Sequence, residues 1–472
     1  MRNSLHRYRL AGVAGGLLLG AGQFLGYLCV FQLIALLPLM VFALRDKRPR
    51  WAALAGLYMG IAYTIPQMVY LRMPVPVTVI LLVWMTIHLM LLCMAIAYFL
   101  PRHVILGPLA VGAVWTILDW INYTAVPVWG MAQSFARSWT SYPFAIQFIS
   151  ITSICGVLFV VAALQGLIAH AILHQSKRIP CITASIVLLV LILSIDTIIW
   201  LEKPTDSLCI AAAGWVLDGR SEGLNPNEAE GFEKLFAEPA REAAAQGAEI
   251  FTTGEMGFYI AGYEWDEWID QFSAVARENN LWLVVGYFNI TLDENRLFFM
   301  SPEGQIVHKY TKTHLTPFEP GHRGNGDLKT VEVDGLTIGA MICQDDNFSQ
   351  RTRYYGNLKA DIVLCPTQDW RTVKNAHLQA VRARAIECNY GIVRGAACGI
   401  TATISARGEV LSKLDHYKSG SGHVIEDIVV YKNRTFFSRF GHWPSLVGAG
   451  GCIGVCIIYR RIEKRRRWHT GV

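Results

Sequence analysis

Long apolar runs separated by short basic clusters occupy the first 200 residues of the chain, and one more lies near the C-terminus. The first run, Leu10 to Leu44, has 35 residues. A helix crossing a membrane core of about 30 Å needs roughly 20 residues, so this run predicts a helical hairpin that turns near Tyr27. A signal peptide is the alternative for the N-terminus, but the run is too long and lacks a small-residue cleavage site before a polar chain.

Six further apolar runs predict single spans, which brings the predicted total to eight. These spans are Trp51 to Leu71, Val77 to Leu100, Val104 to Ile121, Ile146 to His170, Ile179 to Leu201 and Pro444 to Tyr459. With a cytoplasmic N-terminus, eight spans place every basic cluster between them on the cytoplasmic side, as the positive-inside rule requires. The segment from Glu202 to His442 and the loop from Asn122 to Pro143 are then expected on the outer face.

A different pattern fills residues 205 to 435, where short β-branched runs alternate with helix-like segments. The helices are expected at Asn227 to Gln246, Tyr263 to Asn279 and Lys374 to Cys388. The strands are expected at Ser207 to Trp215, Glu249 to Thr252, Leu281 to Phe288, Arg296 to Ser301, Gln305 to Tyr310, Thr330 to Val333, Leu336 to Cys343, Asp361 to Cys365, Gly391 to Ala396 and Thr401 to Ser405. This alternation predicts a layered α/β domain with one large core.

Composition agrees with a membrane protein. Charged residues make up 17% of the 472 residues, and the mean hydropathy is +0.33. The net charge of +6 is modest, and the basic residues cluster at the two ends of the chain and between the spans. This distribution suggests membrane orientation more than binding to nucleic acid. Six of the 11 cysteines lie inside apolar runs, and the other five have no CxxC or Cys/His ligand spacing. Neither a zinc site nor a disulfide framework is therefore predicted.

Three reactive side chains follow predicted strands of the α/β domain. Glu255 follows the strand that ends at Thr252, Lys312 follows the strand that ends at Tyr310, and Cys343 ends its own strand. A carboxylate, an ammonium and a thiol can serve as general base, oxyanion stabiliser and nucleophile. Each has a simpler interpretation when taken alone: a helix-capping carboxylate, a surface lysine and a small core side chain. Their common position at strand ends favours the catalytic interpretation.

Other polar residues predict structural roles. His314 is expected to support its loop by hydrogen bonding, and Glu387 to pair with Arg382 or Arg384. Asp119, late in an apolar span, is expected to face the protein interior. The aromatic-rich loop from Asn122 to Pro143 has two interpretations: an interfacial aromatic belt, or a loop that packs against the extramembrane domain. Three other cysteines of the α/β domain are expected to be buried: Cys365, Cys388 and Cys398.

The order Glu255, Lys312, Cys343 resembles the carbon–nitrogen hydrolase (nitrilase) superfamily. Within it, eight spans with the domain inserted before the last resemble the apolipoprotein N-acyltransferase family over essentially the whole chain. Residues 312–318, Lys-Thr-His-Leu-Thr-Pro-Phe, are similar to the family's Lys-x-His-Leu-x-Pro-Phe segment. Further similarity lies at Pro127, Trp129, Gly130, Gln133, Arg382 to Glu387, Arg394, Gly399 and Ser405 to Gly408.

This resemblance implies an α-β-β-α sandwich at residues 202–442, between a seven-span domain at 1–201 and an eighth span with a basic tail at 443–472. It implies a bacterial inner-membrane enzyme whose catalytic domain faces the periplasm and needs no cofactor. Cys343 would take an acyl chain from a phospholipid as a thioester. The N-terminal amine of a diacylglyceryl-cysteine lipoprotein would then accept the chain. Glu255 would act as base, and Lys312 with a backbone N–H near Gln344 would stabilise the oxyanion.

The chain departs from the family pattern at three places. Thr253-Gly254-Glu255 replaces Trp-Pro-Glu, Glu319 follows Phe318 without the usual glycine, and Gln344-Asp345 replaces Tyr-Glu. Glu319, Gln344 and Asp345 are the candidate supporting residues. The departures motivate an alternative function, a membrane-tethered amidase in which water replaces the lipoprotein amine. A binding protein that has kept the fold without catalysis is a second alternative, although all three reactive groups are present.

Overall fold

The computed structural model describes residues 2–46, 48–125, 129–216, 223–317 and 319–470. These residues form two compact units. One comprises the described parts of Met1–Pro127, Gln133–Ile199 and His442–Val472, and the other comprises Trp200–Gly441 with the described residues of Val128–Ala132.

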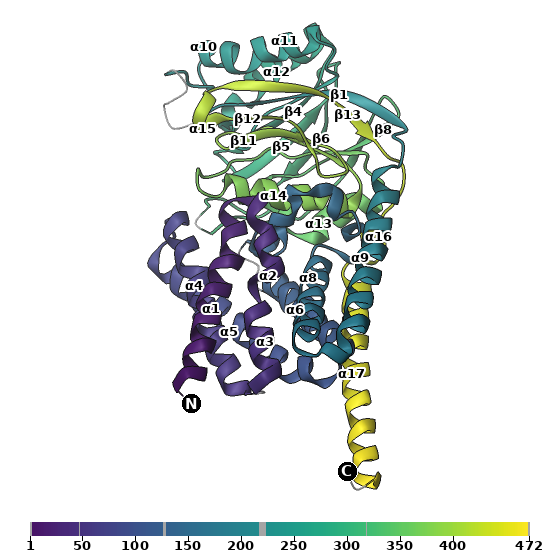
Figure 1. Cartoon of the computed structure of the whole chain (residues 1–472). Helices are drawn as coiled ribbons and strands as arrows, with labels where there is room; N and C mark the ends of the chain where they lie inside the picture. Colours follow the sequence, from purple (N-terminus) through teal and green to yellow (C-terminus); the bar gives the residue numbers. More distant parts are fainter. Residues whose placement is uncertain (1, 47, 126–128, 217–222, 318, 471–472) are drawn as a thin grey trace. The chain divides into compact units, whose positions relative to one another are not determined.

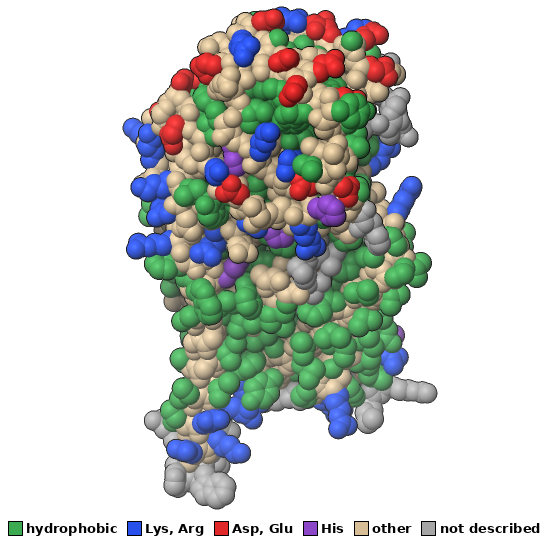
Figure 2. Space-filling model, turned by 180° about the vertical axis from the view of Figure 1, so that it is seen from behind, with side chains coloured by type: hydrophobic (Ala, Val, Ile, Leu, Met, Phe, Trp, Pro, Cys, Tyr) green, Lys and Arg blue, Asp and Glu red, His purple; other side chains and the backbone are tan. Residues whose placement is uncertain are grey.

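The first unit is helical. The expected hairpin is present, because α1 ends at Phe24 and a 3₁₀-helix starts at Gly26 before α2 and α3. The α-helices of this unit are α1 (Arg2–Phe24), α2 (Gln32–Ala35), α3 (Leu37–Asp46), α4 (Pro49–Leu71), α5 (Val75–Phe99), α6 (Leu106–Ala125), α7 (Ile149–Thr152), α8 (Gly156–Leu173), α9 (Arg178–Trp200) and α17 (Trp443–Thr470). Hydrophobic side chains cover the visible face of this unit (Figure 2).

Six helical segments among the described residues are long and apolar enough to cross a membrane. They are Gly26–Asp46, Pro49–Leu71, Val75–Arg102, Gly156–Leu173, Gln175–Trp200 and Trp443–Arg465. Helices α1 and α6 occupy the other two predicted spans but are less apolar, because α1 carries Arg7 and Arg9 and α6 carries Asp119 and Asn122. The structure therefore supports several membrane helices, and the number eight stays a prediction.

The buried carboxylate of Asp119 is paired inside the helical unit. Asp119 is fully buried, as expected, and accepts hydrogen bonds from Oγ of Ser134 (2.6 Å) and the backbone N–H of Phe135 (3.1 Å).

The backbones of α1 and α4 approach closely: a Cβ added at Gly12 would lie 2.3 Å from the carbonyl oxygen of Ala55. Close backbone packing through small residues is typical of helices in a membrane, where burial of apolar surface does not drive association.

The second unit contains two β-sheets. The seven-stranded sheet has the order β13-β1-β2-β4-β5-β6 with β3 paired to β4, and the six-stranded sheet has the order β12-β11-β10-β9-β8-β7. The first sheet consists of β1 (Asp206–Gly214), β2 (Ile250–Thr252), β3 (Phe258–Ile260), β4 (Trp282–Asn289), β5 (Glu294–Met300), β6 (Ile306–Thr311) and β13 (Gly422–Val430). The second consists of β7 (Thr330–Val333), β8 (Leu336–Ala340), β9 (Ile362–Leu364), β10 (Gly391–Arg394), β11 (Ile400–Ile404) and β12 (Val410–Asp415).

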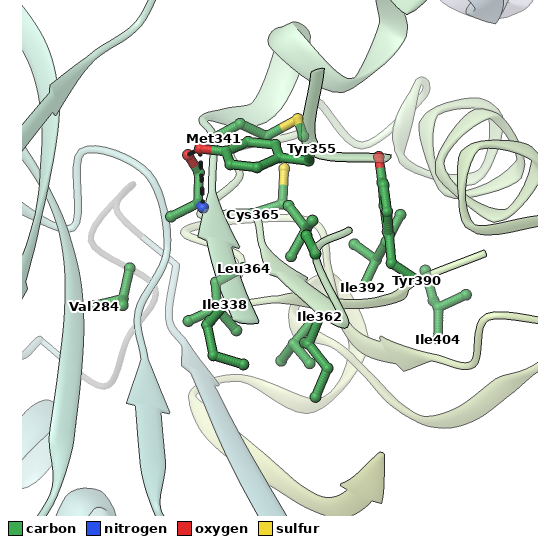
Figure 3. Packing of buried hydrophobic residues seen from close by; sticks show 14 of the residues in the cluster. Val284, Ile338, Met341, Tyr355, Ile362, Leu364, Cys365, Tyr390, Ile392 and Ile404 are labelled. Atoms are coloured by element: carbon green, nitrogen blue, oxygen red, sulfur yellow. Dashed lines mark hydrogen bonds between the residues drawn. The ribbon is translucent and has the colours of Figure 1, made fainter. Parts of the chain in front are cut away.

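One hydrophobic core joins the two sheets. It contains Val284 of the first sheet together with Ile338, Leu364 and Ile392 of the second, all of them buried (Figure 3). A second cluster lies on the other face of the first sheet, where Phe236 contacts both Phe251 of β2 and Phe272. Figure 1 shows α10 (Ala229–Phe232), α11 (Glu238–Ala245) and α12 (Trp265–Asn279) on one side of the strands, and α13 (Ser349–Asn357) and α14 (Lys374–Cys388) on the other.

Several expected boundaries need correction. The helix expected at Asn227 to Gln246 consists of α10, a π-helical turn at Glu233–Ala237, and α11. The strand expected to reach Cys343 ends at Ala340, and a 3₁₀-helix, η9 (Cys343–Asn347), begins at the cysteine. The helix α14 has the predicted bounds. The sequence pattern did not predict the strands β3, β12 and β13, nor the helices α13, α15 (His416–Ser419) and α16 (Phe436–Phe440).

Candidate active site

Cys343 lies at a sharp turn directly after β8 and begins η9. Its backbone φ is +43°, a left-handed conformation that non-glycine residues rarely adopt. The backbone N–H of Cys343 donates to the carbonyl of Pro366 (2.9 Å), the second residue after β9 ends at Leu364, which holds this turn against the neighbouring strand. Backbone strain of this kind concentrates at functional sites, where a tight strand-to-helix turn presents a nucleophile.

Glu255 and Lys312 meet beside this turn. Lys312 comes directly after β6, and its Nζ donates to Oε1 of Glu255 (2.6 Å), with both side chains at most 3% exposed. The Cys343 thiol is a hydrogen-bond partner of the Glu255 carboxyl group. The structure therefore brings together the three reactive residues that follow predicted strands in the sequence.

Glu319 completes this buried cluster. Both of its carboxylate oxygens accept from Nζ of Lys312, at 2.8 and 2.7 Å. The side-chain amide of Asn295, on β5, donates to Glu255 (2.7 Å) and to Glu319 (2.9 Å). One ammonium thus bridges two carboxylates, and Asn295 fixes their separation. Asn295 was not predicted from the sequence. The pattern of its strand does not distinguish a polar side chain that faces the reactive groups from one that faces solvent.

Burial controls the protonation of these groups. It raises the pKa of Glu255, an effect that the charge of Lys312 opposes and the charge of Glu319 reinforces. Burial also raises the pKa of the Cys343 thiol well above its usual value, with Glu255 adding to this and Lys312 opposing it. The pKa of Lys312 is raised, because Glu255, the Cys343 thiolate and Glu319 outweigh the opposite effect of burial. A carboxylate whose pKa is raised is suited to take the proton of a thiol.

Gln344 and Asp345 follow Cys343 in η9 and are buried. Oε1 of Gln344 accepts from the side-chain amide of Asn347 (3.2 Å). Asp345 accepts from Oγ1 of Thr313 (2.6 Å) and from both the backbone N–H and Nδ1 of His314 (2.9 and 2.8 Å). The expectation that His314 supports its loop is confirmed. Asp345 therefore links the turn at Cys343 to the loop that begins with Lys312.

The described residues offer one set of side chains with metal-ligand chemistry. One potential ligand atom each of Cys343, Asp369 and His377 lie within 4.8 Å of one another. Both nitrogens of the His377 ring already bond to carboxylates: Nδ1 to Asp369 (2.6 Å) and Nε2 to Asp346 (2.9 Å). The ring as it stands has no nitrogen available to a metal ion, and we assign no metal role to these residues.

Part of the aromatic loop belongs to this unit. The ring of Trp129 lies 5.9 Å from that of Trp370, and a Cβ at Gly130 would lie 2.6 Å from the carbonyl oxygen of Asn347. The segment Trp129–Ala132 thus packs against the loop after β9 and the last residue of η9, which favours the packing interpretation of this loop over a belt alone. Pro127 and Phe318, which the sequence comparison also used, lie outside the described residues.

Two family models match the chain. The apolipoprotein N-acyltransferase N-terminal domain matches residues 14–167, and the carbon–nitrogen hydrolase family matches residues 223–430. The chain belongs to the apolipoprotein N-acyltransferase family. It therefore joins a carbon–nitrogen hydrolase domain to the membrane domain typical of that family.

Curated relatives agree with the family. An apolipoprotein N-acyltransferase of Geobacter metallireducens is 23% identical over 91% of both chains, and one of Borreliella burgdorferi is 23% identical over 64% of this chain and 65% of that protein. The deaminated glutathione amidase of Mus musculus is 28% identical but covers only 37% of this chain and 63% of the amidase. Among solved structures, an amidase from Nesterenkonia sp. is 19% identical, with a TM-score of 0.40, over 47% of this chain and 90% of the amidase.

The structure shows how the chain accommodates two of the three departures from the family's pattern. Where the family carries proline, a Cβ at Gly254 would lie 2.0 Å from the backbone nitrogen of Ala397, so only glycine fits this contact. Glu319 bonds to Lys312 even though the usual glycine before it is missing.

Glu387 pairs with Arg384 (2.6 Å), and both are fully buried, which confirms one of its two expected partners. Cys365, Cys388 and Cys398 are buried, as expected.

Replacing Asp345 with asparagine is expected to loosen the loop after Lys312. Burial by itself would raise the pKa of Asp345, but hydrogen bonds from His314 and Thr313 outweigh it and lower this pKa. The carboxylate therefore stabilises the domain above its unfolded pKa of about 3.9, and this contribution is lost as the pH falls through the lower folded pKa. Thermal melts of D345N should show a loss of about 1–3 kcal/mol at pH 7. Equal melting of the two proteins at pH 7 would contradict the assignment.

Proposed function

We propose that this chain transfers a fatty acyl chain from a phospholipid, through a thioester on Cys343, to the N-terminal amine of a diacylglyceryl-cysteine lipoprotein. The observation that carries the proposal is the buried contact of Glu255, Lys312 and Cys343 in a chain that also has the membrane domain of the family. Homologues named apolipoprotein N-acyltransferase cover up to 91% of the chain. An enzyme that handles two lipid-anchored substrates gains effective concentration by being held in their membrane.

The reaction has two half-reactions in this proposal. Glu255 takes the thiol proton, and the Cys343 thiolate attacks an ester carbonyl of the phospholipid. The oxyanion is stabilised by Lys312 and a backbone N–H near Gln344, and its collapse releases a lysophospholipid that takes the proton back from Glu255. The lipoprotein amine then attacks the thioester, with Glu255 again accepting a proton, and an amide forms as the thiolate leaves. Glu319 and Asn295 position Glu255 and Lys312 and do not touch the substrate.

We further propose the finer organisation that the family implies. Residues 1–201 form seven spans and residues 443–472 the eighth span with a basic cytoplasmic tail, so that residues 202–442 lie on the periplasmic face of a bacterial inner membrane. The catalytic domain is an α-β-β-α sandwich. The positions of the basic clusters support this orientation.

A trapped acyl-enzyme tests the proposal. Purified full-length protein in detergent is incubated with a phospholipid, and the peptide that contains Cys343 is analysed by mass spectrometry. We expect the mass of one acyl chain on Cys343, and its transfer to a diacylated lipopeptide when that acceptor is added. The amidase alternative predicts ammonia release from simple amides and no triacylated peptide. A protein that forms no acyl adduct and releases no ammonia would support the binding alternative.

A further inference from the structure

A second buried charge network lies next to the nucleophile and takes no part in the mechanism above. Asp369 bonds to Nη2 of Arg394 (2.7 Å) and to Nδ1 of His377 (2.6 Å), while Nε2 of His377 bonds to Asp346 (2.9 Å). All four side chains are at least 93% buried. They come from four different segments: η9, the loop after β9, α14 and β10.

Two members of this network lie close to the sulfur atom of Cys343. The thiol sulfur, a carboxylate oxygen of Asp369 and a ring nitrogen of His377 all lie within 4.8 Å of one another. The thiol also lies 3.6 Å from the carbonyl oxygen of Gln368, the residue before Asp369. The negative charge of Asp369 is one of the causes that raise the pKa of this thiol. An unpaired Asp369 would therefore oppose formation of the thiolate.

The charges in the network balance only when His377 is protonated. Two carboxylates face one guanidinium, so a neutral imidazole would leave one buried negative charge without a partner. Burial alone lowers the pKa of His377, but the charges of Asp346 and Asp369 outweigh it and raise this pKa to about 9. The same partners, His377 and Arg394, hold the pKa of Asp369 below its usual value against the effect of burial.

We propose that His377 is a positioning residue for the nucleophile: as an imidazolium it neutralises Asp369 and links it to Asp346, so that the thiolate of Cys343 forms beside a compensated carboxylate. The proposal rests on the proposed function only in taking Cys343 as the nucleophile. The charged groups that face the His377 ring are Asp346, Asp369 and Arg394. Those that face the thiol are Glu255, Lys312, Asp369 and Arg394. His377 acts on the thiol through Asp369.

The pH dependence of Cys343 alkylation tests this role without any acyl donor. Full-length protein in detergent is treated with iodoacetamide at a series of pH values, and alkylation of the Cys343 peptide is followed by mass spectrometry. His377→Gln removes the positive centre, so the midpoint of the alkylation profile should rise by about one pH unit. Asp369→Asn removes one of the two carboxylates that face the thiol, so its midpoint should fall. His308→Gln, a buried histidine on β6, is the matched control and should leave the midpoint unchanged.

The opposite signs separate electrostatics from loosened packing. A purely structural role would move H377Q and D369N in the same direction, and that result would overturn the proposal. An unchanged or lower midpoint in H377Q would also overturn it. Where H377Q does not fold, D369N decides alone, because a midpoint that fails to fall contradicts the placement of this charge. Because alkylation needs no acyl chain, a missing acyl-enzyme and a missing pH shift are distinguishable results.

Discussion

Replacing Cys343 with alanine is expected to abolish acyl transfer, with a fall in rate on the order of 10⁴-fold or more. The reason is that the sulfur atom forms the bond that carries the acyl chain in the proposed reaction. The substitution removes one buried atom, so the fold should survive with a loss of about 1 kcal/mol. The measurement is formation of triacylated lipopeptide from a phospholipid and a diacylated lipopeptide, together with the acyl adduct by mass spectrometry.

A matched control separates chemistry from packing. Cys209 lies on β1 in the same unit and is partly buried, so Cys209→Ala removes the same atom away from the site. We expect this variant to keep its activity. Transfer by the C343A protein at a rate near that of the unmodified chain would show that Cys343 does not carry the acyl group. The Cys343→Ser variant should also be inactive, because an alcohol beside this carboxylate is a much weaker nucleophile than a thiolate.

The reactive residues could be predicted because they lie where predicted strands end. Glu255, Lys312 and Cys343 each follow a strand of a sheet whose pattern is visible locally. Asp369 obeys the same rule, five residues after β9 ends, and the same reasoning could have selected it. His377 could not be found in this way, because it lies on a helix, and its partner Asp346 is 31 positions away in the sequence.

The missed elements have a similar cause. Strand β13 pairs with β1 across more than 200 residues, with Val430 opposite Asp206. No short turn in the sequence connects these two strands, so the local pattern does not indicate that they pair. The expected helix at 227–246 has the right periodicity, but the π-helical turn at Glu233–Ala237 depends on how its residues pack: Phe236 contacts Phe251 and Phe258 of the sheet. Local pattern predicts the elements, whereas contacts between distant segments decide their ends and partners.

Replacing Lys312 with methionine is expected to impair both catalysis and stability. The rate of acyl transfer should fall on the order of 10³-fold, because the oxyanion loses its charged partner. The domain should lose about 3–5 kcal/mol of stability, because Glu255 and Glu319 are left as two buried carboxylates without a cation. The pKa of Glu255 should rise further, since Lys312 opposes the effects of burial and of Glu319.

A double variant distinguishes these two effects of Lys312. In K312M/E319Q only one buried carboxylate remains, so part of the lost stability should return in denaturant or thermal unfolding of the full-length protein, while acyl transfer should stay low. E319Q alone provides the remaining corner of the cycle and should be much more active than K312M, because Lys312 still faces Glu255 and the thiol. A double variant no more stable than K312M would show that Glu319 is not what Lys312 compensates. Acyl transfer by K312M at the normal rate would limit Lys312 to a structural role, and the oxyanion would then depend on the backbone N–H near Gln344 alone.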